Sequence, residues 1–305
     1  MHDPTITTSG SGYRGAMRDL EIQTRGMTFR GVEDGPEDGP IALLLHGFPD
    51  SHHTWRHLLG PLADAGYRAV APAMRGYAPS DVPADGRYQT AALSLDAIAL
   101  TEALGGRDDA VLIGHDWGAV ASYGAAAHSP STWRRMVTMA VPPTSSVAEA
   151  FLTYDQLRRS WYMFFFQSPL ADMVVAMDDL EYIARLWEDW SPGYPADADV
   201  DHVRSALGEP ERLAAALGYY RAMFDPTLHD PDLAAAQDAL GLPTPIPTLY
   251  LHGQDDGCFG LESIGDPLAS MPEGSRLAII EGAGHFLQLE QPDAVAAHVL
   301  DFLAD

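Results

Sequence analysis

Short, continuous apolar runs alternate along much of the chain with longer segments that carry apolar residues at helical spacing. Turn-forming Gly, Pro and Asp residues bound the apolar runs, which is typical of buried strands in a parallel sheet. We predict strands at residues 41–45, 68–72, 110–113, 136–141, 246–251 and 277–280, and helices at 53–65, 91–104, 117–127 and 292–303. This alternation predicts an α/β fold, with a mostly parallel sheet and helices on both of its faces.

The alternation is interrupted over residues 143–241. This stretch has helical patterns, many aromatic residues, several prolines and no clear buried strand, so we predict a helical cap (lid) inserted into the core. The core then comprises residues 19–142 and 242–305. Residues 20–32 alternate weakly and favour one or two hairpin strands, whereas residues 1–18 lack an apolar period and are expected to form a flexible tail.

Charge restricts the classes of partner. The 305 residues include 18 Lys plus Arg, all of them Arg, and 43 Asp plus Glu, so the formal net charge is −25. A chain this acidic is poorly suited to contact nucleic acid phosphates or to dock on an anionic membrane. We therefore expect neither of these partners; the sequence leaves the oligomeric state open.

The cysteine content and the apolar runs bear on location. The single cysteine, Cys258, excludes an internal disulfide and a cysteine-based metal cluster, and we expect it to be a buried packing residue. The first residues lack the basic-then-apolar order of a signal peptide, and the apolar run at 161–166 is too short to span a bilayer. These features favour a cytoplasmic protein.

The strongest chemical signal is the sequence Gly-His-Asp-Trp-Gly at residues 114–118, between a predicted strand and a predicted helix. This is the spacing of a nucleophile elbow, with Asp116 at the position that serine usually occupies. Glycines permit the sharp strand-to-helix turn, and the central side chain projects beside the amide donors at the start of the helix. The alternative is that Asp116 only caps the helix.

A second loop, His46-Gly47-Phe48-Pro49, follows the predicted strand at 41–45. A loop at this place is typical of those that supply a backbone N–H to an oxyanion hole. We expect the Phe48 and Trp117 amides to form that hole. An ordinary turn at the end of a strand would fit the same glycine and proline.

An acid and a histidine follow the last two predicted strands, at the edge of the sheet where α/β active sites form. Asp256 and its neighbour Asp255 follow the strand at 246–251, and His285 follows the strand at 277–280. The chain order of nucleophile, acid and histidine is that of the triad on this fold. Motif spacing favours Asp256 over Asp255 as the triad acid.

These motifs resemble those of the α/β-hydrolase superfamily, specifically its epoxide hydrolase and dehalogenase branch, over about residue 20 to the end of the chain. The resemblance implies an α/β-hydrolase fold and a nucleophilic carboxylate at Asp116. Such a carboxylate attacks a saturated carbon that bears a leaving group and forms an alkyl-enzyme ester. His285, oriented by Asp256, would then activate the water that hydrolyses this ester.

The predicted cap helps to choose the leaving group. Tyr162 and Tyr220 fall where epoxide hydrolases carry their two lid tyrosines, and two phenols can hydrogen-bond an epoxide oxygen and protonate the alkoxide. The alternative is that both rings belong only to an aromatic lid core. The resemblance thus favours an epoxide hydrolase whose substrates are a small-molecule epoxide and water, with no metal and no organic cofactor.

Two other functions stay open. A haloalkane dehalogenase would use the same nucleophile, and Trp117 could donate its indole N–H to a halide. Such enzymes often carry a second donor, an Asn, where this chain has Phe48; the predicted cap offers Trp161, Trp187 and Trp190 instead. A non-catalytic ligand-binding homologue is less favoured, because no expected member of the site is missing.

Overall fold

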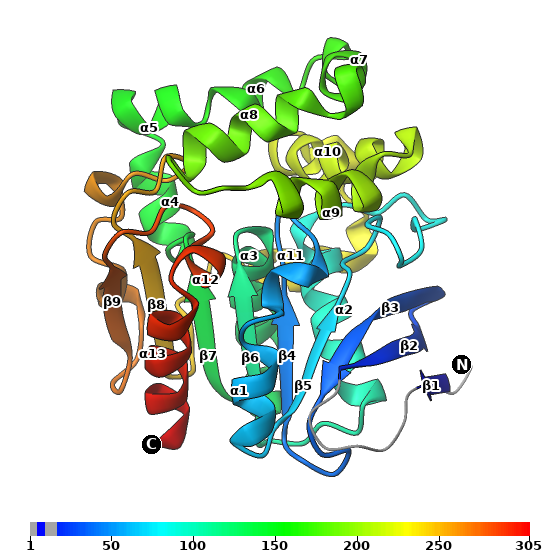
Figure 1. Ribbon diagram of the computed structural model, residues 1–305, viewed down its shortest axis with the longest axis vertical. Helices are drawn as coiled ribbons and strands as arrows, with labels where there is room; N and C mark the ends of the chain where they lie inside the picture. The colour runs from blue at the N-terminus through cyan, green and yellow to red at the C-terminus, as the bar shows by residue number, and fades with distance from the viewer. Residues whose placement is uncertain (1–4, 10–16) are drawn as a thin grey trace.

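The computed structural model describes residues 5–9 and 17–305, and it contains one nine-stranded sheet in the order β1-β2-β3-β5-β4-β6-β7-β8-β9 (Figure 1). The strands are β1 Thr5–Ser9, β2 Arg18–Thr24, β3 Met27–Asp34, β4 Ile41–Leu45, β5 Arg68–Pro72, β6 Ala110–His115, β7 Trp133–Met139, β8 Thr248–Gly253 and β9 Arg276–Ile280. In the order of the sheet, β5, β4, β6, β7, β8 and β9 each run parallel to their neighbour in this series. The pairs β1–β2, β2–β3 and β3–β5 are antiparallel.

The centre of the sheet is covered on both sides. Every residue of β4, β5, β6 and β8 is buried, which explains why these strands are continuous apolar runs in the sequence. The α/β fold with a mostly parallel sheet that the sequence predicted is confirmed. The predicted ranges for β4 and β5 agree with the structure, whereas β7 begins three residues before its predicted start.

The N-terminal region contains one strand that the sequence did not predict. Thr5–Ser9 pairs antiparallel with β2 and extends the hairpin of β2 and β3. In this segment the structure differs from the expected flexible tail. The remainder of that predicted tail up to residue 16, namely residues 1–4 and 10–16, lies outside the described residues.

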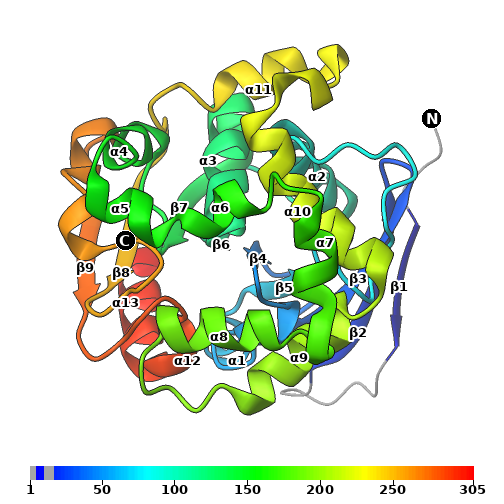
Figure 2. The ribbon, with the colours of Figure 1, turned by 90° about the horizontal axis from the view of Figure 1, so that it is seen from above.

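Helices cover the two faces of the sheet (Figure 2). α1 Leu59–Asp64 and α13 Pro292–Ala304 pack on one face, and α2 Thr90–Ala103, α3 Trp117–His128 and α11 Ala234–Ala239 lie on the other. The helix predicted at 53–65 is divided in the structure into a 3-10 turn, His52–Trp55, and α1. α12 Leu287–Glu290 follows the loop that carries His285.

The chain between β7 and β8 consists of helices and loops, and all of its residues are described. Its α-helices before α11 are α4 Thr144–Ala150, α5 Tyr154–Arg159, α6 Trp161–Phe165, α7 Leu170–Ala176, α8 Glu181–Trp190, α9 Asp197–Leu207 and α10 Pro210–Phe224. Further 3-10 turns of the chain are Pro130–Thr132, Met177–Asp179, Pro226–Leu228, Pro231–Leu233, Leu261–Ser263 and Pro267–Ser270. Helices α5 to α10 lie above the carboxyl ends of the parallel strands (Figure 1). In contrast, α11 packs against α2 and α3.

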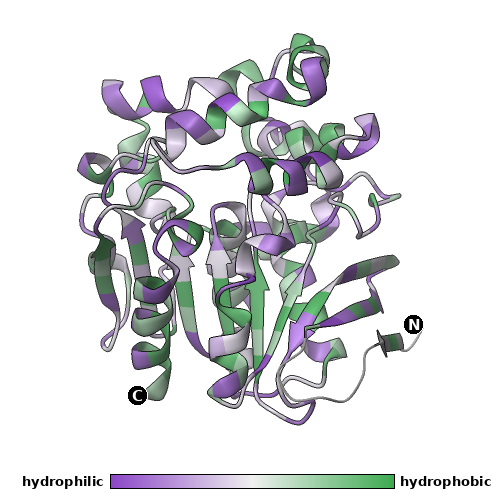
Figure 3. Ribbon diagram, in the orientation of Figure 1, coloured by the Kyte–Doolittle hydropathy of each residue, from purple (hydrophilic) through white to green (hydrophobic). Residues whose placement is uncertain are grey.

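Hydropathy follows this layering, since the central strands are apolar and the outer helices carry polar residues (Figure 3). α8 is an example: it buries Ile183, Leu186, Trp187 and Trp190, which are spaced so as to fall on one side of a helix. Among residues 5–9 and 17–305, none of the helices combines the length and the apolar content needed to cross a membrane.

Candidate active site

Asp116 stands at the junction of β6 and α3 with φ 51° and ψ −119°, a conformation that non-glycine residues rarely adopt. The flanking glycines make this turn possible. A Cβ at Gly118 would lie 2.0 Å from the carbonyl oxygen of Leu45, and a Cβ at Gly114 would lie 2.3 Å from that of Gly118. The strained turn therefore depends on close packing of α3 against β4, and such strain is typical of functional positions.

The Asp116 carboxylate is buried and is held by backbone amides. The Phe48 N–H donates to its Oδ1 at 2.7 Å, and the Trp117 N–H also stabilises its charge. Burial raises the pKa of Asp116 to about 6, although the positive charge of His285 and the two amides oppose that rise. Phe48 and Trp117 thus supply the two amides that the sequence predicted, both at the same carboxylate.

The loop of Phe48 is fixed from both sides. His46 is buried; its Nε2 accepts from the Met74 N–H at 3.0 Å, and its Nδ1 lies 3.0 Å from the Gly47 carbonyl oxygen. A Cβ at Gly47 would lie 2.3 Å from Asp116 Oδ1, so only glycine leaves room for the carboxylate. The Pro49 carbonyl accepts from the indole N–H of Trp187 at 2.8 Å, which connects this loop to α8.

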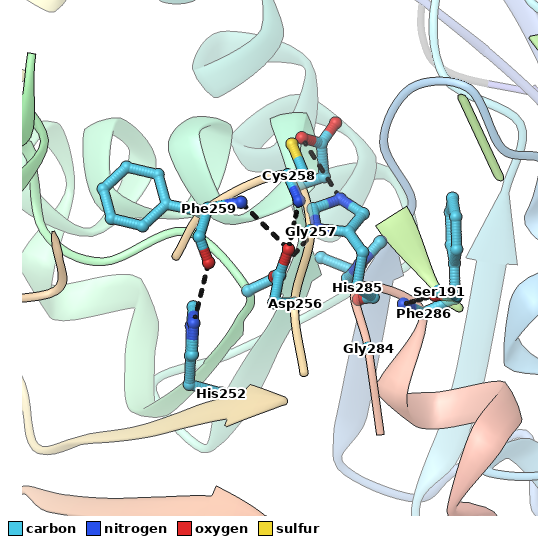
Figure 4. Close-up of polar contacts among 12 residues, drawn as sticks. Ser191, His252, Asp256, Gly257, Cys258, Phe259, Gly284, His285 and Phe286 are labelled. Carbon is cyan, nitrogen blue, oxygen red and sulfur yellow. Dashed lines mark hydrogen bonds and ion pairs between the residues drawn. The ribbon is translucent and has the colours of Figure 1, made fainter. Parts of the chain in front are cut away.

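Asp256 and His285 form a buried pair (Figure 4), with Asp256 Oδ2 3.0 Å from His285 Nδ1. The other oxygen of Asp256 accepts from the Cys258 and Phe259 N–H groups at 2.7 and 2.9 Å. Although burial acts to raise the pKa of Asp256, the charge of His285 and these hydrogen bonds lower it below its ordinary value. Asp255 is exposed, so of the two neighbouring aspartates Asp256 is the one paired with the histidine.

His285 faces the nucleophile with its second nitrogen. Its Nε2 lies 3.7 Å from Asp116 Oδ2 and has no hydrogen-bond partner among the described residues. Burial acts to lower the pKa of His285, but the charges of Asp256 and Asp116 outweigh burial and raise it. The geometry leaves Nε2 free to take a proton from a water placed beside Asp116.

Tyr162 on α6 and Tyr220 on α10 line the same pocket as Asp116. Their ring centroids lie 5.7 Å apart and both side chains are buried. The Tyr162 hydroxyl lies 3.4 Å from Cys258 Sγ, and the Tyr220 hydroxyl has no partner among the described residues. Burial raises the pKa of both phenols well above 10, so both are protonated donors at neutral pH.

The sequence did not identify three residues that support this site. Cys258 lines the pocket and contacts Tyr162, which goes beyond the buried packing role expected for it. Trp190 packs its ring against the His285 ring, with centroids 5.1 Å apart. Glu290 accepts from the N–H groups of Gly284 and Phe286 at 2.8 and 3.1 Å and so fixes the loop around His285. In the sequence, Cys258 stands beside the acid and Trp190 enters only as a halide donor of the cap, whereas Glu290 gives no signal.

Three groups of the types that bind metals converge here: ligand atoms of Asp256, Cys258 and His285 all lie within 4.8 Å of one another. Both oxygens of Asp256 and the Nδ1 of His285 are already hydrogen-bonded. Burial also raises the pKa of the Cys258 thiol well above its ordinary value, which keeps the thiol protonated. The arrangement fits an acid–histidine pair better than a metal site.

The fold and the site together define a class of protein. A mostly parallel sheet carries a side chain on a sharp turn after β6, followed by an acid after β8 and a histidine after β9. This order and geometry are those of an α/β hydrolase, with an aspartate in the place of the usual serine.

Comparison with known proteins gives the same class and narrows it. The family model for the alpha/beta hydrolase fold matches residues 40–292. Epoxide hydrolase A of Mycobacterium tuberculosis is 31% identical over 95% of this chain and 98% of its own length, and an epoxide hydrolase of Caballeronia sordidicola is 30% identical over 96% and 95%. The crystal structure of Epoxide Hydrolase A from Mycobacterium thermoresistibile covers 95% of this chain and 98% of its own, with a TM-score of 0.78 and 26% identity. The chain belongs to the α/β-hydrolase family and, within it, to the epoxide hydrolase branch.

Proposed function

We propose that this protein is an epoxide hydrolase that converts an epoxide and water into a vicinal diol through an ester on Asp116. The observation that carries the proposal is a single buried pocket in which a carboxylate and two protonated phenols, Tyr162 and Tyr220, lie together. An epoxide needs both kinds of group, because one of its carbons must be attacked while its oxygen is protonated.

In the first step an oxygen of Asp116 attacks one epoxide carbon, and the bond between that carbon and the epoxide oxygen breaks. Tyr162 and Tyr220 donate hydrogen bonds to the departing oxygen, and one of them delivers the proton that makes it a hydroxyl. The product of this step is a hydroxyalkyl ester of Asp116. The carboxylate is neutralised by this reaction.

That loss of charge prepares the second step. The negative charge of Asp116 is one of the causes that raise the pKa of His285, so ester formation lowers this pKa and favours the neutral histidine. Neutral His285, held by Asp256, takes a proton from water as the water attacks the ester carbonyl carbon. The Phe48 and Trp117 N–H groups stabilise the resulting oxyanion. Its collapse expels the alkoxide, which takes the proton held by His285 and leaves as the diol. The proton that remains on the Asp116 carboxyl returns to the tyrosinate, which restores the Asp116 carboxylate, neutral His285 and both phenols.

In this proposal the helices inserted between β7 and β8 act as a cap. They contribute both tyrosines and close the pocket over the carboxyl ends of the strands. Since Asp116, Asp256 and His285 come from the core and the phenols come from the insertion, both parts are required for the first step.

Haloalkane dehalogenation is less well supported, because a halide requires donors that the insertion does not offer. The indole N–H of Trp187 donates to Pro49, Trp161 is 49% exposed, and the ring of Trp190 packs on His285. None of these three tryptophans lines the pocket of Asp116.

The test is a single-turnover reaction of wild type and His285→Gln with a panel of alkyl epoxides, aryl epoxides and haloalkanes, followed by intact-protein mass. We expect wild type to release diols and His285→Gln to retain an added mass equal to the whole epoxide, because the base that hydrolyses the ester is gone. Asp116→Asn is the control that should gain no mass.

Other masses would decide against the proposal. An adduct equal to a haloalkane less hydrogen halide, with no epoxide adduct, would indicate a dehalogenase. Neither adduct nor turnover with any member of the panel would sink the proposed epoxide hydrolysis.

A further inference from the structure

The pocket at Asp116 extends in one direction, between α3, α4, α6 and α10. The cavity itself has a volume of about 100 Å³ and opens to solvent. Beyond the catalytic groups its wall is formed chiefly by apolar side chains, among them Val120, Val141, Val147, Phe151, Met163 and Met223. A pocket of this composition binds a ligand by removing apolar surface from water.

The polar groups in this wall already have partners. The Tyr123 hydroxyl bonds to Thr138 and to the Val141 carbonyl. The Gln156 side chain donates to Ser160 and to the Cys258 carbonyl, and its oxygen accepts from Gly260. A bound substituent therefore needs no polar atoms of its own to satisfy this wall.

Charge gives a second constraint. Among the described residues that line the pocket, only Asp116 can carry a full charge near neutral pH, and that charge is negative. No cationic side chain of the described lining can pair with a carboxylate or phosphate on the substrate. Burying such an anion unpaired beside a carboxylate is strongly unfavourable.

Packed aromatic rings surround the Phe48 loop, whose N–H group contacts Asp116. Phe166 packs against Phe48 and Tyr220, with ring centroids 5.5 and 5.2 Å apart. Trp187, whose indole N–H donates to the same loop, stacks on Phe286 at 3.4 Å. All five of these side chains are buried and only Tyr220 lines the pocket, so a second large substituent would have to displace packed rings.

We propose that the preferred substrates are terminal epoxides that carry one uncharged, extended apolar substituent, which lies along α4 and α10 against Val147, Phe151 and Met223. This inference rests on the proposed epoxide hydrolysis and specifies which epoxides the enzyme prefers. The pocket selects for a long substituent on one epoxide carbon and against substituents on both.

The expected size of the effect follows from burial. Each methylene removed from water by the pocket improves kcat/KM about fourfold, until the substituent reaches the solvent-exposed mouth. An internal epoxide with the same number of carbons places part of its chain against the aromatic wall. We expect its kcat/KM to be at least about tenfold lower, since overpacking a filled core is unfavourable.

The experiment compares three sets of substrates on the wild-type protein: terminal epoxyalkanes from epoxybutane to epoxydecane, a symmetrical internal epoxyoctane, and a terminal epoxyalkane that ends in a carboxylate. We expect kcat/KM to rise along the first set, with the internal and the carboxylate substrates well below terminal epoxyoctane. A flat series, or an internal or carboxylate substrate equal to terminal epoxyoctane, would overturn the inference.

A matched pair of variants locates the effect. Val147→Asp places a carboxylate in the pocket wall, whereas Ala148→Asp places it on the exposed side of the same helix. We expect the ratio of kcat/KM for epoxydecane to that for epoxybutane to fall at least about tenfold in Val147→Asp and to stay near the wild-type ratio in Ala148→Asp. Equal ratios in both variants would show that α4 does not contact the substituent.

The experiments distinguish a failure of the proposed function from a failure of the proposed selectivity. If wild type turns over no epoxide and His285→Gln gains no mass, the proposed function is wrong and this inference falls with it. If epoxides are turned over without dependence on chain length or on the position of the substituent, only the selectivity is wrong.

Discussion

Two buried aspartates lie on either side of His285, and their pKa values move in opposite directions. Burial dominates at Asp116 and raises its pKa to about 6, whereas the histidine and two backbone amides overcome burial at Asp256 and lower its pKa. The same residue type thus serves as a reactive group in one place and as a permanent charge in the other. The environment of each carboxylate, rather than its identity, determines which role it can take.

The first prediction concerns pH. Asp116 must be ionised to attack in the proposed mechanism, so we expect kcat/KM to fall as the pH decreases through about 6, where Asp116 takes up a proton. Single-turnover ester formation in His285→Gln, followed from pH 4 to 9, would isolate the contribution of Asp116. A rate of ester formation that is constant down to pH 4.5 would contradict the assignment of a raised pKa to the nucleophile.

The second prediction separates the two adjacent aspartates. Asp256→Asn removes the charge that stabilises protonated His285, so we expect ester hydrolysis to slow by at least about 100-fold, with accumulation of the ester on Asp116. Asp255→Asn alters an exposed side chain and should leave kcat near the wild-type value. Intact-protein mass during turnover measures the accumulated ester in both variants. The opposite result would assign the triad acid to Asp255.

Among the individual residues of the site, the sequence predicted those that come directly after a strand. Asp116, Asp256 and His285 each come just after an apolar run, and the carboxyl ends of parallel strands meet at one edge, so their meeting follows from topology. Trp190 reaches His285 through the packing of α8, and its distance from His285 along the chain gives no sign of that contact. Glu290 is close in sequence, four residues after Phe286, but its contacts to backbone N–H groups depend on the turn between β9 and α12, which no apolar pattern reveals.

At the level of helices and strands, the contact that shapes the site most directly is the close approach of α3 to β4. Gly118 lies in the first turn of α3, and its missing side chain lets the helix touch the end of β4. The same approach brings the start of α3 close to the Phe48 loop, where the two amides meet Asp116. The packing of one helix against one strand therefore sets the geometry of the proposed oxyanion hole.

A pair of glycine substitutions tests this packing. Gly118→Ala would place a Cβ 2.0 Å from the Leu45 carbonyl oxygen, and we expect it to reduce the free energy of unfolding by about 1–3 kcal/mol and to abolish ester formation. Gly241→Ala, after α11, meets only the Asp238 carbonyl oxygen at 3.6 Å, an ordinary contact, and should change the free energy of unfolding by no more than about 0.5 kcal/mol. Urea denaturation and the single-turnover assay provide the two readouts. Equal stability of the two variants would show that the close approach is not required.

The elements that the sequence predicted well are those whose burial is complete. β4 and β5 are buried at every position, so their apolar runs carry the whole signal. β1 is an edge strand paired only with β2, and its Thr-rich sequence has no apolar run from which it could be found. The predicted helix at 53–65 kept helical spacing throughout, which does not distinguish a 3-10 turn followed by a helix from one continuous helix.

For the molecule as a whole, the excess of acidic residues gives each arginine many possible partners, and two of the pairs among the described residues, Arg68–Glu33 and Arg75–Asp96, are buried. Arg75, after β5, makes a two-pronged contact with Asp96 of α2 at 2.6 and 2.7 Å. Its carbonyl also accepts from the Tyr219 hydroxyl of α10 at 2.6 Å. This residue therefore joins the core to the inserted helices.

The fourth prediction is that stability depends on this buried pair far more than on surface pairs. Asp96→Asn removes the hydrogen-bonded carboxylate of Arg75, leaving among the described residues only the Asp85 carboxylate at 3.9 Å, and also removes the ion-pair partner of Arg25. We expect a loss of about 3–5 kcal/mol in the free energy of unfolding. The matched control is Glu188→Gln, which breaks an exposed pair with Arg185 and should cause no measurable change. Denaturation curves for the two variants that coincide would contradict this distinction.

The position of the helical insertion also sets the order in which a ribosome makes the active site. In the proposed mechanism the nucleophile, Asp116, emerges before the insertion, and the acid Asp256 and the base His285 emerge after it, on the order of 100 residues later. At ordinary rates of translation that separation corresponds to roughly 5–20 s. Throughout this interval the nascent chain contains the residue that would be alkylated and lacks the residues that would regenerate it. A ribosome that stops within the insertion would leave a product that is unable to complete a single turnover, whatever part of it had folded.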